Sequence, residues 1–245
     1  MDINDLILRI FIPAIPHIIL LYLLLKTGKN PDPLPRSKCP KYELIEAGIY
    51  TLIVIICLAL NIFVLKPIFD SIYITLGLNS ITFLFVPLIY THYKNHWTIK
   101  DLGINSKIKS WQVAVFSIII NVYIGFYNSL FIEISLFVLV IFFYSNAFLE
   151  EFLFRGVIQS KLERALGQKK AIIFQGLLFM LIHIPVNTFQ FFLDVNYLLF
   201  FSRFGFQLIN GFAFGLIYLK TRNIWMPIIC HYLNNWLGAI ITLFL

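Results

Sequence analysis

Residues 150–155 place two carboxylates and a guanidinium at the end of an apolar stretch. That stretch, from Ser135 to Phe154, is otherwise almost free of charge. A charged group at membrane depth costs roughly 3 kcal/mol on insertion scales, so three within six residues indicate a specific use. On a helix, Glu151 and Arg155 are four residues apart, share a face and can neutralise one another as a structural ion pair. Glu150 lies about 100° around the helix and needs a partner of its own.

His183 is the first candidate partner for Glu150. Gly167 is the natural turn between two helices, since glycine commonly ends a helix. Glu150 precedes Gly167 by 17 residues and His183 follows it by 16. At 1.5 Å per residue, both lie roughly 25 Å from the turn, so antiparallel helices bring them level. We therefore expect Glu150 and His183 to face one another.

His231 and Asn235 are further candidates, from the last apolar run. His231 follows Arg222 by nine residues, or roughly 13 Å into the membrane. It reaches the depth of Glu150 if the hairpin around Gly167 protrudes by two to three turns. We expect that protrusion because its charged residues belong in water: Lys161, Glu163 and Arg164. Asn235 is four residues after His231 and faces the same way.

An acid, two imidazoles and an amide in a low-dielectric pocket can activate water. The carboxyl group of Glu150 can take a proton from water, and the imidazoles of His183 and His231 can orient the water or bind a metal. The amide of Asn235 can stabilise a tetrahedral oxyanion. The sequence contains no His-Glu-x-x-His helix, no Gly-x-Ser-x-Gly and no Gly-rich phosphate loop.

The composition is that of a polytopic membrane protein. Hydrophobic residues make up 60% of the 245 residues and charged residues only 13%, against about a quarter in soluble domains. The net charge of +7 comes from cations in short loops between apolar runs, where they set topology, so we do not expect nucleic-acid binding. Three scattered cysteines are too few for a disulfide framework.

The apolar runs predict an all-α protein with about eight transmembrane helices and an active site among the last four. The first run has no basic region before it and no cleavage site after it, which favours an uncleaved span over a signal peptide. We divide the chain into N-terminal transmembrane helices and cytoplasmic loops, residues 1–110, and a core, residues 111–245. The expected spans are residues 6–25, 44–65, 71–91, 111–131, 135–154, 170–185, 197–219 and 224–244.

Alternate connections carry 16 of the 19 Lys and Arg residues. The rich connections are 26–43, the loop before residue 111, 155–170 and 220–222. The positive-inside rule places them in the cytoplasm and both termini outside. Eight spans keep this alternation consistent.

Three motifs in the second half resemble those of the CPBP intramembrane proteases. That family includes the type II CAAX prenyl endopeptidases and the bacteriocin-processing, abortive-infection proteins. The resemblance covers about residues 100–240 and begins with the loop Asp101-Leu102-Gly103-Ile104. Its motifs are Glu150-Glu151-x-x-x-Arg155-Gly156, Phe179-x-x-x-His183 and His231-x-x-x-Asn235.

The resemblance implies an intramembrane endopeptidase and a role for each matching residue. Glu150 is the base that activates water and His183 helps to hold it, while His231 and Asn235 complete the site as metal ligand or oxyanion donor. Glu151 and Arg155 brace the site, and Phe179 packs beside it. The family leaves a bound divalent metal such as zinc open, with Glu150, His183 and His231 as candidate ligands. We favour a metal-free site, because the candidate histidines His183 and His231 do not form a His-x-x-x-His pair on one helix.

The expected substrate is a peptide bond in a small or membrane-associated peptide or protein, reached from the cytoplasmic side. An Ile-, Phe-, Asn- and Lys-rich sequence hints at a bacterial plasma membrane, where this family matures peptide pheromones or bacteriocins or gives self-immunity. One alternative is a non-proteolytic scaffold or immunity protein that binds a peptide or sensor kinase. The other is a proton-coupled transporter, against which the lack of an evident inverted repeat counts.

Overall fold

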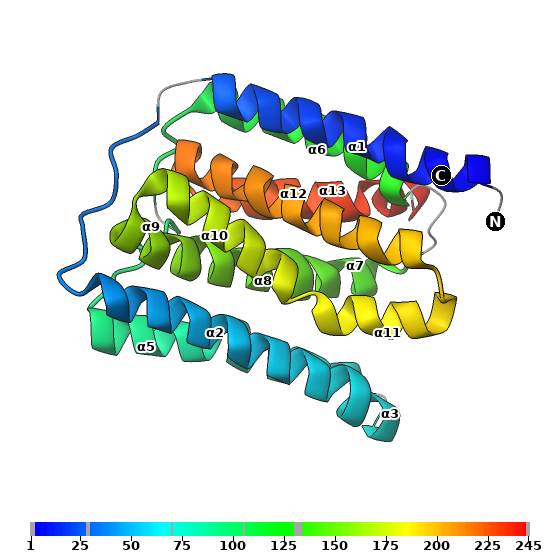
Figure 1. Cartoon of the computed structure of the whole chain (residues 1–245), viewed down its shortest axis with the longest axis horizontal. Coiled ribbons are helices and arrows are strands. Elements are labelled where there is room, and N and C mark those ends of the chain that lie inside the picture. The colour runs from blue at the N-terminus through cyan, green and yellow to red at the C-terminus, as the bar shows by residue number, and fades with distance from the viewer. Residues whose placement is uncertain (1–2, 28–29, 70, 105, 130–133, 244–245) are drawn as a thin grey trace.

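The chain folds into helices, as the computed structural model shows, and the longest connections follow α1 and α5 (Figure 1). The structure describes residues 3–27, 30–69, 71–104, 106–129 and 134–243, with side chains from residue 14 onward except 127–129. No strand forms among these residues, which confirms the all-α prediction. The expected span ends at residues 130–131 and 244 lie outside the described residues.

Four helical segments form the first half of the chain. Two of them contain a short π-helical stretch, in which the hydrogen bonds run from i to i+5. The segments are α1 (Ile3–Lys26); α2, η1 and α3 (Pro40–Leu60, Asn61–Leu65, Lys66–Phe69); α4, η2 and α5 (Ile72–Ser80, Ile81–Phe85, Val86–Asn95); and α6 (Trp111–Ser129).

Four further segments form the second half. The first is one long helix interrupted by two π-helical stretches. The segments are α7, η3, α8, η4 and α9 (Leu136–Phe142, Phe143–Phe148, Leu149–Glu151, Phe152–Gln159, Ser160–Leu166); α10 and α11 (Gln168–Leu181, Ile184–Asp194); α12 (Tyr197–Thr221); and α13 (Trp225–Leu243).

These eight segments follow the expected spans in order. Among the described residues, four segments are long and apolar enough to cross a membrane, and a fifth qualifies if the bent pair α10–α11 is one span. These findings are those of a multi-pass membrane protein. The count of eight spans stays a prediction, because the described apolar parts of α1 and α6 are short and α13 is not among the segments that qualify.

The sixth expected span, 170–185, is wrong at its end. The helix bends by 42° after Leu181 and continues as α11 to Asp194. Pro185, in the first turn of α11, has no N–H with which to continue the hydrogen-bond ladder. His183 lies at the bend, immediately before α11. The bend therefore positions one of the candidate site residues.

The helices form three layers (Figure 1). α1 and α6 lie on one side, α2 and α5 on the other, and the long helix of α7 to α9 lies between them with α10, α12 and α13. One apolar core joins α2 and η2 to η4 and α10, and a second joins α1 and α6 to α12 and α13. The middle layer thus carries the candidate residues, shielded on both sides.

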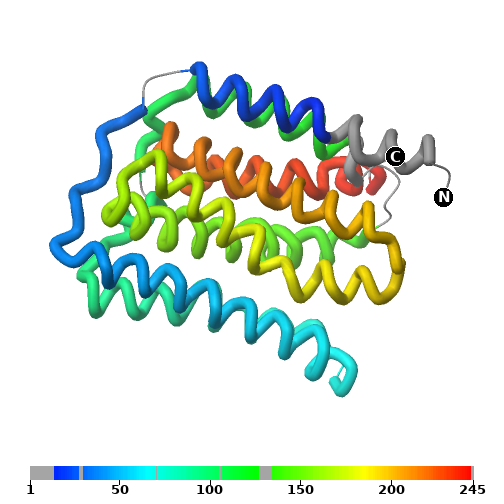
Figure 2. The backbone as a smooth tube through the Cα atoms, viewed as in Figure 1, coloured from blue at the N-terminus to red at the C-terminus, as the bar shows by residue number. Residues whose placement is uncertain are grey.

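The described parts of the basic connections meet at one end of the molecule, which we call the basic end (Figure 2). Hydrogen bonds join them: Lys220 donates to the carbonyl of Thr27, Gln168 to that of Pro31, and Asn223 to that of Ser106. This clustering agrees with the predicted topology, in which these connections share the cytoplasmic side.

Lys161 and Glu163, expected in water, are buried instead, at no more than 1% exposure. Lys161 pairs with Glu43 at 3.0 Å and also with Glu46, both on α2. Glu163 receives two hydrogen bonds from Arg222, of 2.7 and 2.6 Å. Each charge is compensated by a partner from another segment, which makes burial tolerable.

Arg164 is also largely buried rather than solvated. It pairs with Asp101 at 3.2 Å and lies over the ring of Trp97 at 4.8 Å. Partial burial raises the pKa of Asp101, but hydrogen bonds from Thr98 and the charge of Arg164 outweigh it, so the pKa lies below its ordinary value. The expectation of water around α9 is therefore wrong for all three residues.

Candidate active site

Glu150 and Glu151 lie on α8, a three-residue α-helical step between the π-helical stretches η3 and η4. Single π turns inside α-helices are rare overall, but those that do occur are often found at functional sites. Here they set the angle at which the two adjacent acids leave the helix. Glu151 is fully buried, whereas the side chain of Glu150 is 17% exposed.

Glu151 holds both Arg155 and His231. Its Oε2 lies 2.9 Å from Nε of Arg155, so the expected i, i+4 ion pair is confirmed. Its Oε1 lies 2.8 Å from Nδ1 of His231 on α13. Because a carboxylate oxygen accepts, His231 carries its proton on Nδ1, and in the neutral ring Nε2 keeps a lone pair. The sequence did not predict this link between Glu151 and His231.

Arg155 is fully buried and surrounded by aromatic rings. Its guanidinium carbon lies 4.5 Å from the ring centre of Phe179 and 5.6 Å from that of Phe214. Nη2 donates to the carbonyl of Gly211 on α12 at 3.2 Å. Arg155 therefore ties α8 and η4 to α10 and α12, as a brace would.

Glu150 faces His183 across a gap. Its Oε2 lies 3.8 Å from Nε2 of His183, too far for a direct hydrogen bond. Nδ1 of His183 lies 2.8 Å from the carbonyl of Phe179, so it carries the proton and Nε2 of the neutral ring is an acceptor. Oε2 of Glu150 is buried and has no hydrogen-bond partner among the described protein groups. Two acceptors at this separation suit one bridging water that donates to both.

Phe179 connects the two halves of the site. Its ring centre lies 5.0 Å from that of His183 and 6.2 Å from that of His231. The ring of His231 also stacks on Phe214 at 4.9 Å. The ring of Phe179 thus lies beside both histidines, and each histidine faces a different acid: His183 faces Glu150, and His231 faces Glu151.

Asn235 and Asn234 point to different surroundings. Asn235 is half-buried, and its side chain makes no hydrogen bond to the described protein groups. Asn234 is buried and donates to Asn121 of α6 at 3.0 Å. Its amide also lies 3.4 Å from Nε2 of His17 on α1. Asn234 is thus occupied between helices, which leaves Asn235 as the amide candidate of α13.

The donor groups do not fit a three-ligand metal centre. Among the described residues, no three His, Cys, Asp or Glu side chains form a group that holds a metal ion. Glu151 engages His231 and Arg155, and Glu150 with His183 supplies only two donors. Zinc sites in proteins use at least three such ligands at about 2 Å. As the structure places them, Glu150, His183 and His231 form no such three-ligand group, and their role as metal ligands stays a prediction.

Two glutamines were missed by the sequence analysis. Gln175 of α10 donates to the carbonyl of Gly211 at 2.7 Å, and Gln159 donates to that of Gly215 at 2.9 Å. The spacing Gly211-x-x-x-Gly215 is the signal that was available, since small residues four apart let membrane helices approach closely. These bonds fix α10 and η4 against α12 behind Arg155.

Arg203, left unassigned in the sequence, pairs with Asp194 at 2.9 Å and so ties α12 to the end of α11. It plays no part in the four-residue cluster.

A polar cavity of about 430 Å³ lies beside η3, on the side of α8 away from the basic end. Asn146, four residues before Glu150, contributes to its wall. Asn61 and Thr75, from the segments of α2 and α4, line it too and hydrogen-bond to each other at 3.2 Å. Glu150 itself does not line this cavity, whose volume is wide enough for part of a peptide.

Comparison with known proteins identifies residues 130–237 with the family described as "Type II CAAX prenyl endopeptidase Rce1-like". The matched segment contains all the candidate residues. No curated protein and no solved structure matches the chain significantly.

Proposed function

Residues 130–237 belong to the CPBP family of intramembrane proteases, and on that premise we propose that Glu150 activates the water that cleaves a peptide bond. The observation that carries this proposal is the buried, unpartnered Oε2 of Glu150, 3.8 Å from the acceptor nitrogen of His183. A water between them donates one hydrogen to each. That places its oxygen lone pairs toward the substrate.

In the first step, Glu150 takes one proton from the water while the oxygen attacks the carbonyl carbon of the scissile bond. His183 keeps the water oriented through its second hydrogen, and its own ring is fixed by the bond from Nδ1 to the carbonyl of Phe179. The product of this step is a tetrahedral carbon with a negative oxygen. Glu150 is now neutral and holds the proton.

In the second step, the C–N bond breaks and the leaving nitrogen takes the proton from Glu150. The water is thus divided between a new carboxylic acid, which keeps the oxygen and the second hydrogen, and a new amine, which receives the first. Glu150 returns to its ionised state. The half-buried amide of Asn235 supplies N–H groups for the negative oxygen, which is the group that changes charge most during the reaction.

Glu151 and Arg155 act by positioning. Glu151 accepts the hydrogen bond from Nδ1 of His231 and so fixes the orientation of the imidazole ring. Nε2 of that ring therefore points away from Glu151. Arg155 compensates the charge of Glu151 inside an aromatic enclosure. The two acids thus have separate tasks: Glu150 exchanges protons, and Glu151 stays charged and structural.

The substrate that we propose is a small or membrane-associated peptide in a bacterial plasma membrane, such as a peptide pheromone or a bacteriocin precursor, or a peptide bound for self-immunity. The resemblance to bacteriocin-processing proteins supports this choice. An opening toward the cytoplasmic side also stays a prediction, since the polar cavity described above lies on the other side of α8.

The test uses purified full-length protein in lipid with a pool of bacterial precursor peptides, and reads the products by mass spectrometry. We expect cleavage by wild type and a loss of at least a hundredfold for Glu150→Gln, the scale of general-base contributions. Asp194→Asn is a matched control, because it removes an exposed carboxylate outside the site.

Cleavage by Glu150→Gln at the wild-type rate contradicts the mechanism. Incubation with a chelator tests the metal question separately: we expect no loss of activity, and a loss that zinc restores would assign the chemistry to a metal. Full biological function of a Glu150→Gln strain without any cleavage would instead favour the scaffold.

A further inference from the structure

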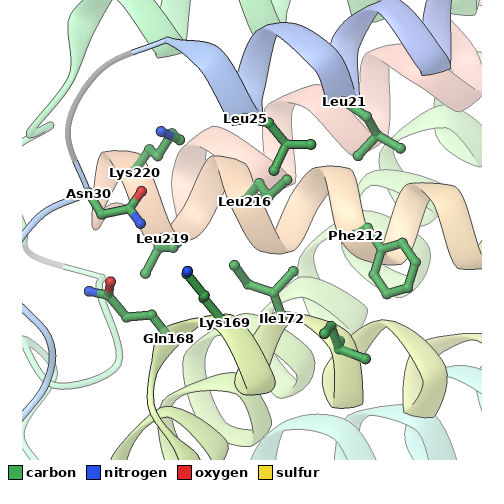
Figure 3. A pocket seen from close by; sticks show the side chains of 11 residues that line it. Leu21, Leu25, Asn30, Gln168, Lys169, Ile172, Phe212, Leu216, Leu219 and Lys220 are labelled. Atoms are coloured by element: carbon green, nitrogen blue, oxygen red, sulfur yellow. The ribbon is translucent and has the colours of Figure 1, made fainter.

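An apolar groove lies between α1 and α10, with α12 as its floor (Figure 3). Its volume is about 440 Å³, within the range of roughly 300–1,000 Å³ typical of ligand sites. Leucines and isoleucines from the three helices face one another across it, and asparagine, glutamine and lysine side chains gather at one end. Its lining residues in α12 are Phe212, Leu216, Leu219 and Lys220.

The apolar part follows the length of the helices. Leu21 and Leu25 of α1 are one turn apart and form one wall, while Ile172 and Ile173 of α10 form the other. Ile173 is 51% exposed, so the groove opens sideways toward the surroundings of the helices. In a membrane, this opening faces lipid chains.

The charge at the polar end is entirely positive. Lys169 and Lys220 line the groove, and none of its lining residues is acidic. Lys220 is 4% exposed, and its Nζ is anchored by a 2.7 Å hydrogen bond to the carbonyl of Thr27. Lys169 is exposed and takes part in no ion pair among the described residues. The two ammonium groups come from different helices and frame the same end (Figure 3).

The position of the polar end of the groove relative to the membrane determines which ligand can reach it. Lys169 is in the first turn of α10 and Lys220 in the last turn of α12, both at the basic end. The positive-inside rule places that end at the cytoplasmic surface. Anionic lipids give that leaflet its negative surface potential, and basic pockets between transmembrane helices bind their head groups.

We propose that this groove binds one anionic phospholipid of the cytoplasmic leaflet. The phosphate lies between Lys169 and Lys220, and one acyl chain follows the apolar floor along Leu219, Leu216 and Phe212. Both ends of the groove then match the ligand: cations meet the head group, and branched aliphatic side chains meet the chain.

This site is separate from the proposed protease centre. Gly211 of α12 turns its carbonyl toward Arg155 and Gln175, whereas the next residue, Phe212, lines the groove. Lipid binding therefore does not require that the protein be a protease. The two proposals can fail independently.

The test measures lipid retention by native mass spectrometry of the purified full chain, titrated with phosphatidylglycerol or phosphatidylcholine. We expect wild type to retain one phosphatidylglycerol in preference to phosphatidylcholine. Lys169→Gln should weaken that binding by about fivefold, the contribution of one lysine near an anionic surface. Lys170→Gln is the matched control, because this neighbouring exposed lysine does not line the groove and its loss should leave binding unchanged.

Ile173→Trp tests the apolar part, since a larger side chain at this exposed position fills the groove without disturbing the core. It should abolish the selective binding of one lipid, with an unchanged melting temperature. Equal retention of both lipids, or equal loss in the Lys169 and Lys170 variants, would overturn the proposal. So would competition by soluble glycerol phosphate or by a hydrophobic peptide, or a dimer that excludes the lipid, because each would assign the groove to another occupant.

Discussion

Glu150 and Glu151 are adjacent and chemically identical, yet the structure predicts that replacing each by glutamine has a different effect on the stability of the protein. Glu151→Gln should unfold the site, because it removes the negative charge that faces fully buried Arg155 at 2.9 Å and His231 at 2.8 Å. Glu150→Gln should leave stability unchanged, because Oε2 of Glu150 has no hydrogen-bond partner to lose.

The magnitude follows from the burial of the pair. Removing one partner of a fully buried ion pair costs about 3–5 kcal/mol, since the remaining charge stays in a medium that does not solvate it. For a chain of this size, each kcal/mol lowers the melting temperature by about 2–4 °C. Glu151→Gln should therefore melt roughly 6–20 °C below wild type, and Glu150→Gln within about 2 °C of it.

Thermal unfolding followed by tryptophan fluorescence, in one detergent and at one protein concentration, measures both variants. A third variant isolates the charge effect. Arg155→Met combined with Glu151→Gln removes both members of the pair, so it should regain part of the stability lost by Glu151→Gln alone. Peptide cleavage by the same samples tests catalysis apart from folding.

Equal melting temperatures for wild type and Glu151→Gln would refute the reasoning, because Arg155 would then tolerate burial without its partner. So would a double variant less stable than Glu151→Gln. A large drop for Glu150→Gln would show that this acid is structural and would remove the basis for its role as a base.

Three other perturbations test the fold. Gly125→Ala should strongly lower the melting temperature, because a Cβ at this position would lie 1.7 Å from a backbone oxygen of α13; Gly77→Ala, with open space around it, should be neutral or slightly stabilising. Lys161→Met should cost about 3 kcal/mol in urea unfolding, since it leaves two glutamates of α2 facing each other; a loss below about 0.5 kcal/mol would contradict the ion-pair network. Asp101 has a lowered pKa, so its stabilisation is present above the unfolded pKa of about 4 and is lost as the pH falls through the folded value. The stability difference between wild type and Asp101→Asn should therefore be largest at neutral pH and vanish in acid, and a difference independent of pH would refute this assignment.

The local patterns in the sequence predicted the features that depend on spacing along one helix. The ion pair of Glu151 and Arg155 follows from their separation of four residues. The hairpin at Gly167 follows from the tendency of glycine to end a helix, and the structure gives this glycine a φ of +84°. The level arrangement of Glu150 and His183 follows from counting residues on both sides of that turn. Each of these needs only helical geometry.

The features that sequence reasoning missed depend on partners distant in the chain. Lys161 was expected in water because its neighbours are polar, but its carboxylate partner Glu43 lies 118 residues away. His231 pairs with Glu151 and not with Glu150. Which of the two glutamates faces His231 depends on how the π-helical stretches η3 and η4 rotate the helix, and no local sequence pattern reveals that rotation. Whether a charged side chain can be buried depends on a partner of opposite charge, and that partner can lie far away in the sequence.

The buried pairs of α9 also constrain the order in which the chain is completed during synthesis. Lys161 finds its partners on α2, which leaves the ribosome first. Glu163 pairs with Arg222, which is synthesised 59 residues later. After α9 has emerged, the partners of Lys161 and Arg164 have thus already been made, while Glu163 waits for the end of α12. The long central helix acquires its final environment only after most of the protein has been made, and a chain that stops before Arg222 would leave Glu163 without the cation that compensates its charge.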